Sequence, residues 1–216
     1  MRIVGKPASQ LTETDGVHCH VAVHLNGVHR RSPHDIKVGW EGDAGSIEIN
    51  GIQYLLQQAH WHSPPEHSIN GKRYDMELHM TYASPDLKVQ NNIVVVAVLY
   101  KIGPPDAFLS KLMKDVALMT NKKAERSIGV IDPSELIKLG GNKNYYRYVG
   151  SLTIPPCTEG VIWIISKQIR TVSKEQINLL RVAVHDYADL NARPVQSLNL
   201  FQEIQVSDNS ARDKHN

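Results

Sequence analysis

The feature that most constrains the fold of this chain is the apolar run "NIVVVAVLY" at residues 92–100. A continuous apolar run rich in β-branched residues is typical of a strand buried on both faces at the centre of a sheet. The run is far too short to span a bilayer, which takes about 20 residues of helix. The chain is therefore expected to fold around a central sheet, without a membrane span.

Other strand patterns lie on both sides of this run. Asn-Gly pairs at 50–51 and 70–71 predict tight turns, and the first of them fits a hairpin between two strands. In "DIKVGW", Ile36, Val38 and Trp40 alternate with other residues and so share one face of a strand. The expected strand segments are 35–40, 46–62 around the first turn, 69–84, 92–103, 145–156 and 161–169.

Two segments have the spacing of amphipathic helices. Residues 106–120 begin after two prolines and repeat apolar residues at helical intervals. Residues 173–190 open with Ser173 and Gln176, which form a capping box. A short helical turn is expected within 132–141. The whole reads as one mainly β domain with peripheral helices.

Composition excludes some classes of protein. The 216 residues suit a single domain, and the formal net charge of +2 without a basic run argues against a nucleic-acid-binding protein. The segment 1–10 has no apolar core of the length that a signal peptide needs. Eleven histidines are many for this length, and they point to the chemistry.

The stretch "QQAHWHSPPEHS" at 57–68 holds three of these histidines. Residues two apart in a strand project from the same face, so His60 and His62 point together. His79 lies on the next expected strand, beyond a turn, so the two strands can be antiparallel neighbours. Three imidazoles then converge, and they leave one tetrahedral position open, as in catalytic rather than structural zinc sites.

Two further side chains could orient these imidazoles. Gln58 lies two residues before His60, and Glu77 lies two residues before His79, so each faces the same side as its histidine. Metal-bound histidines usually donate their other N–H to a carboxylate or an amide. An isolated HxH pair is more often a pair of surface or core histidines, but the third histidine and the two partners favour a metal site.

A second cluster competes for the metal. His18, Cys19, His20 and His24 also offer imidazole and thiolate groups. No carboxylate or amide lies within this cluster to orient its rings. We therefore interpret it as a solvated segment, to be revised if metal analysis finds a second equivalent.

Several segments together resemble the alpha-class carbonic anhydrases, and "WEGDAGSIEINGIQYLLQQ" is most similar to the plant branch. The other matching segments, which agree in order and spacing between about His34 and Val206, are "QQAHWHSPPEHSINGKRYDMELHMTY", "SLTIPPCTEGVIWII" and "NARPVQSLN". The resemblance implies a large, twisted, mostly antiparallel central sheet with peripheral helices. It also implies a Zn²⁺ enzyme that converts carbon dioxide reversibly to bicarbonate and a proton, and that is inhibited by sulfonamides and small anions.

The resemblance assigns roles to individual residues. His60, His62 and His79 correspond to the zinc ligands. Thr153 resembles the threonine that accepts a hydrogen bond from zinc-bound hydroxide, and Glu66 resembles the carboxylate that takes the proton of that threonine.

Further positions match the proton path and the substrate pocket. His34 falls at the position of the proton-shuttle histidine, whereas His67 is interpreted as a structural histidine. Thr81 stands where many members have an apolar residue, which makes the pocket slightly more polar. The residues that resemble the apolar wall for carbon dioxide are Val95, Leu152, Val161 and Trp163.

The N-terminal segment departs from the family. Residues 1–30 lack the expected tryptophan-rich entry and a "QSPI"-like stretch, and they lack the apolar alternation of a strand, so we expect them to be loosely packed. An altered first exon, an error in the gene model and a truncation would each produce this pattern. Cys157 stands where secreted members have one half of a disulfide, and we expect Cys19 and Cys157 to be mostly unpaired.

The domain is therefore expected over 31–206, with a polar tail at 207–216. The resemblance suggests secretion or the chloroplast, although no signal or transit peptide is visible. The alternatives to an enzyme are a non-catalytic relative such as the dioscorin storage proteins, or a module that only binds zinc. The presence of all three zinc histidines favours the enzyme.

Overall fold

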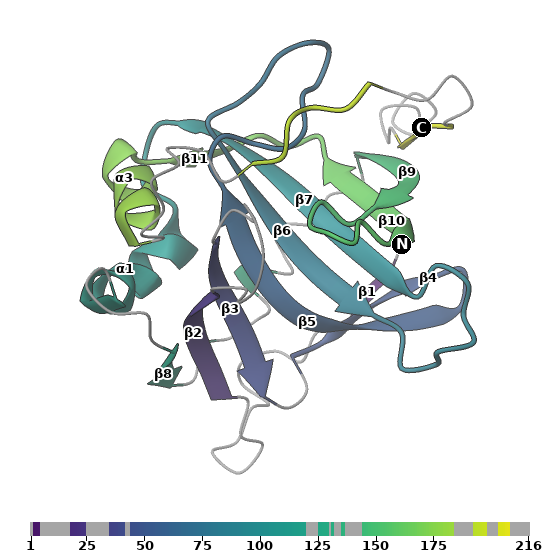
Figure 1. The fold of residues 1–216 in the computed structure, drawn as a ribbon, viewed down its shortest axis with the longest axis horizontal. Helices are drawn as coiled ribbons and strands as arrows, with labels where there is room; N and C mark the ends of the chain where they lie inside the picture. The colour runs from purple at the N-terminus through teal and green to yellow at the C-terminus, as the bar shows by residue number, and fades with distance from the viewer. Residues whose placement is uncertain are drawn as a thin grey trace, which may run out of the picture.

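The computed structural model describes residues 2–4, 18–24, 35–41, 44–119, 125–129, 131, 135–136, 144–183, 192–197 and 203–207. These residues build one large mixed sheet, with two helices close together at one side of it (Figure 1). The strands are β1 (Arg2–Val4), β2 (His18–His24), β3 (Asp35–Glu41), β4 (Ser46–Ile49), β5 (Ile52–His62), β6 (Met76–Ala83), β7 (Ile93–Ile102), β8 (Glu125–Gly129), β9 (Tyr145–Ser151), β10 (Glu159–Ser166), β11 (Arg170–Val172) and β12 (Gln205–Ser207). The helices are α1 (Ala107–Met119) and α3 (Lys174–Ala183).

The described part of the sheet runs in the order β12-β9-β10-β7-β6-β5-β3-β2-β8. Outside this order, β4 pairs with β5 and with β1, and β11 pairs with β7. The pairs that β7 makes with β10 and with β11 are parallel, and the other described pairs are antiparallel. The apolar run at 92–100 forms β7 in the middle of this order. The prediction of a mainly β, mostly antiparallel fold with a central strand at this run is confirmed.

The central strands separate two layers of apolar side chains. On β7, the even-numbered residues from Val94 to Tyr100 join a cluster that also holds buried residues of α1 and α3, such as Leu112 and Ile177. The odd-numbered residues Val95, Ala97 and Leu99 join a second cluster on the other face. Alternation along the strand therefore gives one face to the helices and the other to the candidate site.

The expected turns and caps are present. Asn50 and Gly51 have φ of 51° and 79°, the left-handed conformation that a two-residue hairpin turn requires at both positions. The backbone N–H of Gln176 donates to Ser173 Oγ at 3.2 Å, and the N–H of Ser173 donates to Gln176 Oε1 at 3.2 Å. These two bonds are the predicted capping box at the start of α3.

The prediction that residues 1–30 contain no strand is wrong at two places. Residues 2–4 pair with β4 as β1, and residues 18–24 pair with both β3 and β8 as β2. In "HCHVAVH", Cys19, Val21 and Val23 do alternate with the other residues, and the histidines between them obscured this period of two. The loose packing of the segment remains a prediction.

Neither α1 nor α3, the helices in the described part of the chain, combines the length and the apolar character that a bilayer-spanning helix needs.

Candidate metal centre

Three histidines meet on the face of the sheet opposite the helices. His60 and His62 lie on β5, and His79 lies on β6 directly opposite His60 in the antiparallel register. The ring centroids are 4.9 Å apart for His60 and His62, 5.2 Å for His60 and His79, and 4.7 Å for His62 and His79. One ring nitrogen of each histidine lies within 4.8 Å of the others, so the three can hold one metal ion.

The environment favours the neutral form of two of these imidazoles, those of His60 and His79. Burial lowers the pKa of His60 well below its ordinary value, and the neighbouring His62 and His79 lower it further. Burial also lowers the pKa of His79, although Glu77 opposes this shift. Because a metal binds the neutral form of histidine, the donor set suits a cation such as Zn²⁺.

Each of two histidines has a hydrogen-bond partner where the sequence places it. His60 Nδ1 lies 2.8 Å from Gln58 Oε1, and His79 Nε2 lies 2.9 Å from Glu77 Oε1. A metal would therefore take the other nitrogen of each ring, Nε2 of His60 and Nδ1 of His79. Such partners set the tautomer and the orientation of a ligating ring.

Glu77 connects the metal centre to the loop that follows β5. Its Oε2 accepts hydrogen bonds from the backbone N–H groups of Glu66 at 2.8 Å and His67 at 2.9 Å. Burial alone would raise the pKa of Glu77, but His67 and His79 hold it well below its usual value through charge and hydrogen bonds. Glu77 is therefore ionised, and it fixes the loop against β6.

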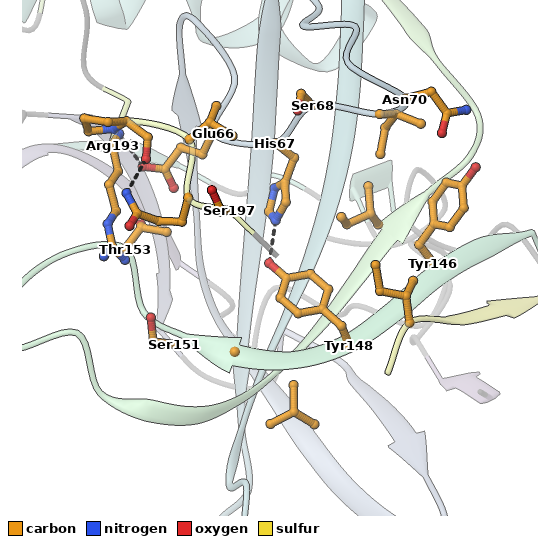
Figure 2. A pocket seen from close by; sticks show the side chains of 18 of the residues that line it. Glu66, His67, Ser68, Asn70, Tyr146, Tyr148, Ser151, Thr153, Arg193 and Ser197 are labelled. Carbon is orange, nitrogen blue, oxygen red and sulfur yellow. Dashed lines mark hydrogen bonds between the residues drawn. The ribbon is translucent and has the colours of Figure 1, made fainter. Parts of the chain in front are cut away.

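His67, which we interpret from the sequence as a structural histidine, has hydrogen-bond partners at both ring nitrogens. Its Nδ1 lies 2.5 Å from Glu77 Oε1, and its Nε2 lies 2.6 Å from the hydroxyl of Tyr148 (Figure 2). Burial would lower the pKa of His67, but the carboxylate of Glu77 outweighs this effect and raises it. His67, Glu77 and His79 are also close enough together to hold a metal, but hydrogen bonds already occupy both ring nitrogens of His67.

Glu66 lies close to two of the three histidines and also lines a cavity. Its Oε1 accepts the backbone N–H of Arg193 at 2.9 Å. Its Oε2 lies 3.8 Å from His62 Nε2 and 4.0 Å from His79 Nδ1, and it has no hydrogen-bond partner among the described residues. Burying a carboxylate oxygen without a hydrogen-bond partner costs free energy, so this atom is suited to accept a hydrogen bond from another group in the site.

Thr153 lines the same cavity as Glu66, which has a volume of about 850 Å³ (Figure 2). Figure 2 shows Glu66, Thr153 and Arg193 at one end of this cavity, and Tyr146 and Asn70 at the other. No hydrogen bond joins Thr153 to Glu66 in the described structure. The structure thus places Thr153 and Glu66 at the same end of one cavity, without a hydrogen bond between them.

Apolar side chains lie beside the histidines. Val95, Val161 and Trp163 are buried in the cluster on the site face, and Leu152 packs against it. The ring of Trp163 meets that of His79 edge to face, with centroids 4.9 Å apart. The four residues expected to form an apolar wall are thus brought together next to a candidate ligand.

Some expected residues are not placed. His34 lies outside the described residues, and its role remains a prediction. The side chains of His18, Cys19, His20 and His24 on β2 also lie outside the description, so the competing cluster is untested. Cys157 has a free thiol and a positive φ of 59° in the turn between β9 and β10.

Sequence reasoning missed two contributors to the site. Arg193 holds Glu66 through its backbone across 127 positions, and Tyr148 holds His67 across 81 positions. The quoted "NARPVQSLN" contains Arg193, but a backbone hydrogen bond gives no signal in side-chain pattern. Tyr148 alternates with Tyr146 in "YYRY", which indicates a shared face but not the partner.

Comparison with known proteins identifies the family. Residues 18–204 match the model of eukaryotic-type carbonic anhydrases, which covers most of the chain. The chain belongs to the alpha carbonic anhydrase family.

The curated relatives include plant proteins whose sequences are about 50% identical to this chain. The chain is 53% identical to carbonic anhydrase Nec1 of Nesocodon mauritianus over 182 residues, which are 84% of this chain and 65% of that protein. It is 49% identical to alpha carbonic anhydrase 7 of Arabidopsis thaliana over 175 residues, which are 81% of this chain and 62% of that protein. The chain thus spans less than two thirds of the length of these relatives.

Solved structures share the fold. A dioscorin complexed with ascorbate superposes with a TM-score of 0.77 at 39% identity, over 89% of this chain and 74% of that one. The alpha carbonic anhydrase of Thermovibrio ammonificans, in complex with the inhibitor sulfanilamide, superposes with a TM-score of 0.73 at 31% identity, over 94% of this chain and 78% of that one.

Proposed function

We propose that this protein is a zinc enzyme that hydrates carbon dioxide reversibly to bicarbonate and a proton. The observation that carries the proposal is the meeting of His60, His62 and His79 within 4.8 Å on one sheet face. Membership of the alpha carbonic anhydrase family supports the reaction in general. The ligand set and the residue roles are the finer part of the proposal.

In this proposal, His60 offers Nε2, His79 offers Nδ1 and His62 completes the ligand set. A zinc ion held by these three neutral nitrogens would retain its full charge and would lower the pKa of a bound water to about 7. Gln58 and Glu77 keep the rings of His60 and His79 in the tautomers that present a lone pair to the metal.

Thr153 and Glu66 orient the attacking oxygen. The hydroxyl of Thr153 has one proton, and it gives this proton to the carboxylate of Glu66 as a hydrogen bond. Its own oxygen can then only accept, so it selects the lone pair that faces the substrate. The Oε2 atom of Glu66 suits the role because it is buried and has no other partner among the described residues.

Carbon dioxide and the released proton need different side chains. Carbon dioxide is apolar, and the wall of Val95, Leu152, Val161 and Trp163 offers it apolar contacts beside the metal. The released proton must reach solvent, and we assign His34 to carry it because histidine titrates near neutral pH. Sulfonamides and small anions are expected to compete for the metal, as the sulfanilamide complex of a related enzyme suggests.

A non-catalytic role is the second candidate. The likeness to dioscorin, at 39% identity and a TM-score of 0.77, favours it. A storage protein of this kind would keep the fold without turnover. The three histidines and their two hydrogen-bond partners favour the enzyme.

One assay separates the candidates. We would measure carbon dioxide hydration by the purified chain by stopped flow, with zinc content determined on the same sample. About one zinc per chain and a rate well above that of buffer, abolished by acetazolamide, are expected. Stoichiometric zinc without turnover would favour a zinc-binding module, and absence of both would overturn the proposed function.

A further inference from the structure

The segment that carries Glu66 into the site has an unusual backbone. Residues 63–67, "SPPEH", follow β5 directly. Pro64 and Pro65 have no backbone N–H, so this part of the segment cannot donate hydrogen bonds to a neighbouring strand. Pro65 and Glu66 are nevertheless buried. The position of Glu66 therefore depends on groups that reach the segment from elsewhere in the fold.

One peptide unit of this segment is anchored at both of its polar atoms. The carbonyl oxygen of Pro65 accepts a hydrogen bond from Arg73 Nε at 2.8 Å. The N–H of the same peptide unit, which belongs to Glu66, donates to Glu77 Oε2 at 2.8 Å. Both directions are fixed, because a guanidinium only donates, whereas a carbonyl oxygen and an ionised carboxylate only accept. A cation and an anion thus grip the Pro65–Glu66 peptide from its two sides.

This peptide unit sets the direction of the Glu66 side chain. A peptide unit is planar and ends at a Cα atom, so its orientation limits where the next side chain can point. The carboxylate has one further anchor, since its Oε1 accepts the backbone N–H of Arg193 at 2.9 Å (Figure 2). Its Oε2 lies 3.8 Å from His62 Nε2. A rotation of the Pro65–Glu66 peptide would move both oxygens of Glu66 relative to the site.

Arg73 itself is not part of the site. It is exposed, and it is neither among the described residues that line the cavity of Glu66 nor among those that could hold the metal. The adjacent cation, Lys72, is also exposed, but its Nζ lies over the ring of Tyr74, 4.8 Å from the centroid. The two neighbouring cations therefore have different contacts, and Lys72 provides a matched control.

We propose that Arg73 is a positioning residue, which acts through the Pro65–Glu66 peptide to hold the carboxylate of Glu66 where it can accept the hydroxyl proton of Thr153. The inference rests on the proposed function for the role of Glu66, and on the hydrogen bonds of this structure for the geometry. Without the guanidinium, the carbonyl of Pro65 would lose its donor, and the peptide unit would be held only through its N–H.

The first test needs neither zinc nor activity. Hydrogen exchange of the backbone N–H groups of Glu66 and His67, which both donate to Glu77 Oε2, is measured by NMR in the metal-free protein. In Arg73→Met, which keeps an apolar stem but has no donor, we expect these two groups to exchange about three- to tenfold faster. The amides of β7 should keep their native rates, which excludes a general loss of stability. In the control Lys72→Met, all of these rates should be native.

The second test measures carbon dioxide hydration with the zinc content determined on the same samples. In Arg73→Met, kcat/KM should fall by about three- to tenfold at unchanged zinc content, because a displaced carboxylate orients the attacking oxygen less well. Arg73→Lys should recover part of this loss, since an ammonium can donate to the same carbonyl but lacks the fixed plane of a guanidinium. In a Glu66→Ala background, Arg73→Met should cost no further activity, because no carboxylate is left to position.

The outcomes are distinct. Native exchange rates at Glu66 and His67 in Arg73→Met would overturn the inference, as would equal losses of activity with and without Glu66. If the native chain binds zinc but does not hydrate carbon dioxide, the proposed function fails, whereas the exchange rates still test the contact of Arg73 with the segment.

Discussion

The two faces of β6 carry different kinds of buried residue, and they have different roles. Leu78 and Met80 point to the helix side, where they are fully buried in the large apolar cluster. Glu77 and His79, which alternate with them, are equally buried but polar, and each of them has hydrogen-bond partners. A single strand therefore contributes to the stability of the domain with one set of residues and to its chemistry with the other. Substitutions on the polar face should therefore affect zinc binding, whereas substitutions on the apolar face should affect stability.

The largest effect is expected on the polar face. His79→Ala removes one of three ligands, so the variant should hold no stoichiometric zinc after dialysis and should have no carbon dioxide hydration activity. Metal analysis and stopped-flow assays measure both losses. A variant that keeps one zinc per chain would contradict the ligand assignment.

The matching substitution on the apolar face is Leu78→Ala, one residue away. Leu78 is fully buried, so its truncation leaves a cavity and should lower the free energy of unfolding by about 2–5 kcal/mol. Urea unfolding of the metal-free protein measures this value. The folded variant should still bind one zinc, and loss of zinc at full occupancy of the folded state would break the distinction between the faces.

A smaller effect is expected from His34→Ala, which leaves both faces of β6 intact. If His34 exports the proton, turnover should fall by about tenfold or more while zinc content is unchanged. Added imidazole should restore much of the rate, because a soluble buffer can replace a shuttle but not a ligand. Full activity in the variant, or no rescue by imidazole, would remove His34 from the mechanism.

The smallest effect concerns the two cysteines, Cys19 in the N-terminal segment and Cys157 in the turn between β9 and β10. We predict that Cys19 and Cys157 are mostly unpaired, so two thiols should titrate in the native protein and a reducing agent should leave the melting temperature unchanged. A disulfide that closed so long a loop would contribute roughly 4 kcal/mol. Peptide mapping that finds a Cys19–Cys157 bond, with a lower melting temperature after reduction, would contradict this.

Local pattern was enough to predict much of the molecule. The apolar run of β7, the turn at Asn50-Gly51 and the capping box of α3 depend on residues that are near one another in the chain. The pattern was misread at residues 18–24, where three histidines hid an alternating strand that the structure pairs on both sides.

The sequence by itself determined which residues could meet at the site, because strand alternation places His60, His62, Gln58, Glu77 and His79 on the side where each must be. Register decided the rest. The pairing of β5 with β6 sets His60 opposite His79 and puts Thr81 beside Gln58, and a shift of one residue would separate them. The contacts of Glu66 with Arg193 and of His67 with Tyr148 join segments that are far apart in the chain. Such contacts depend on where the whole sheet brings those segments, and no local pattern encodes that position.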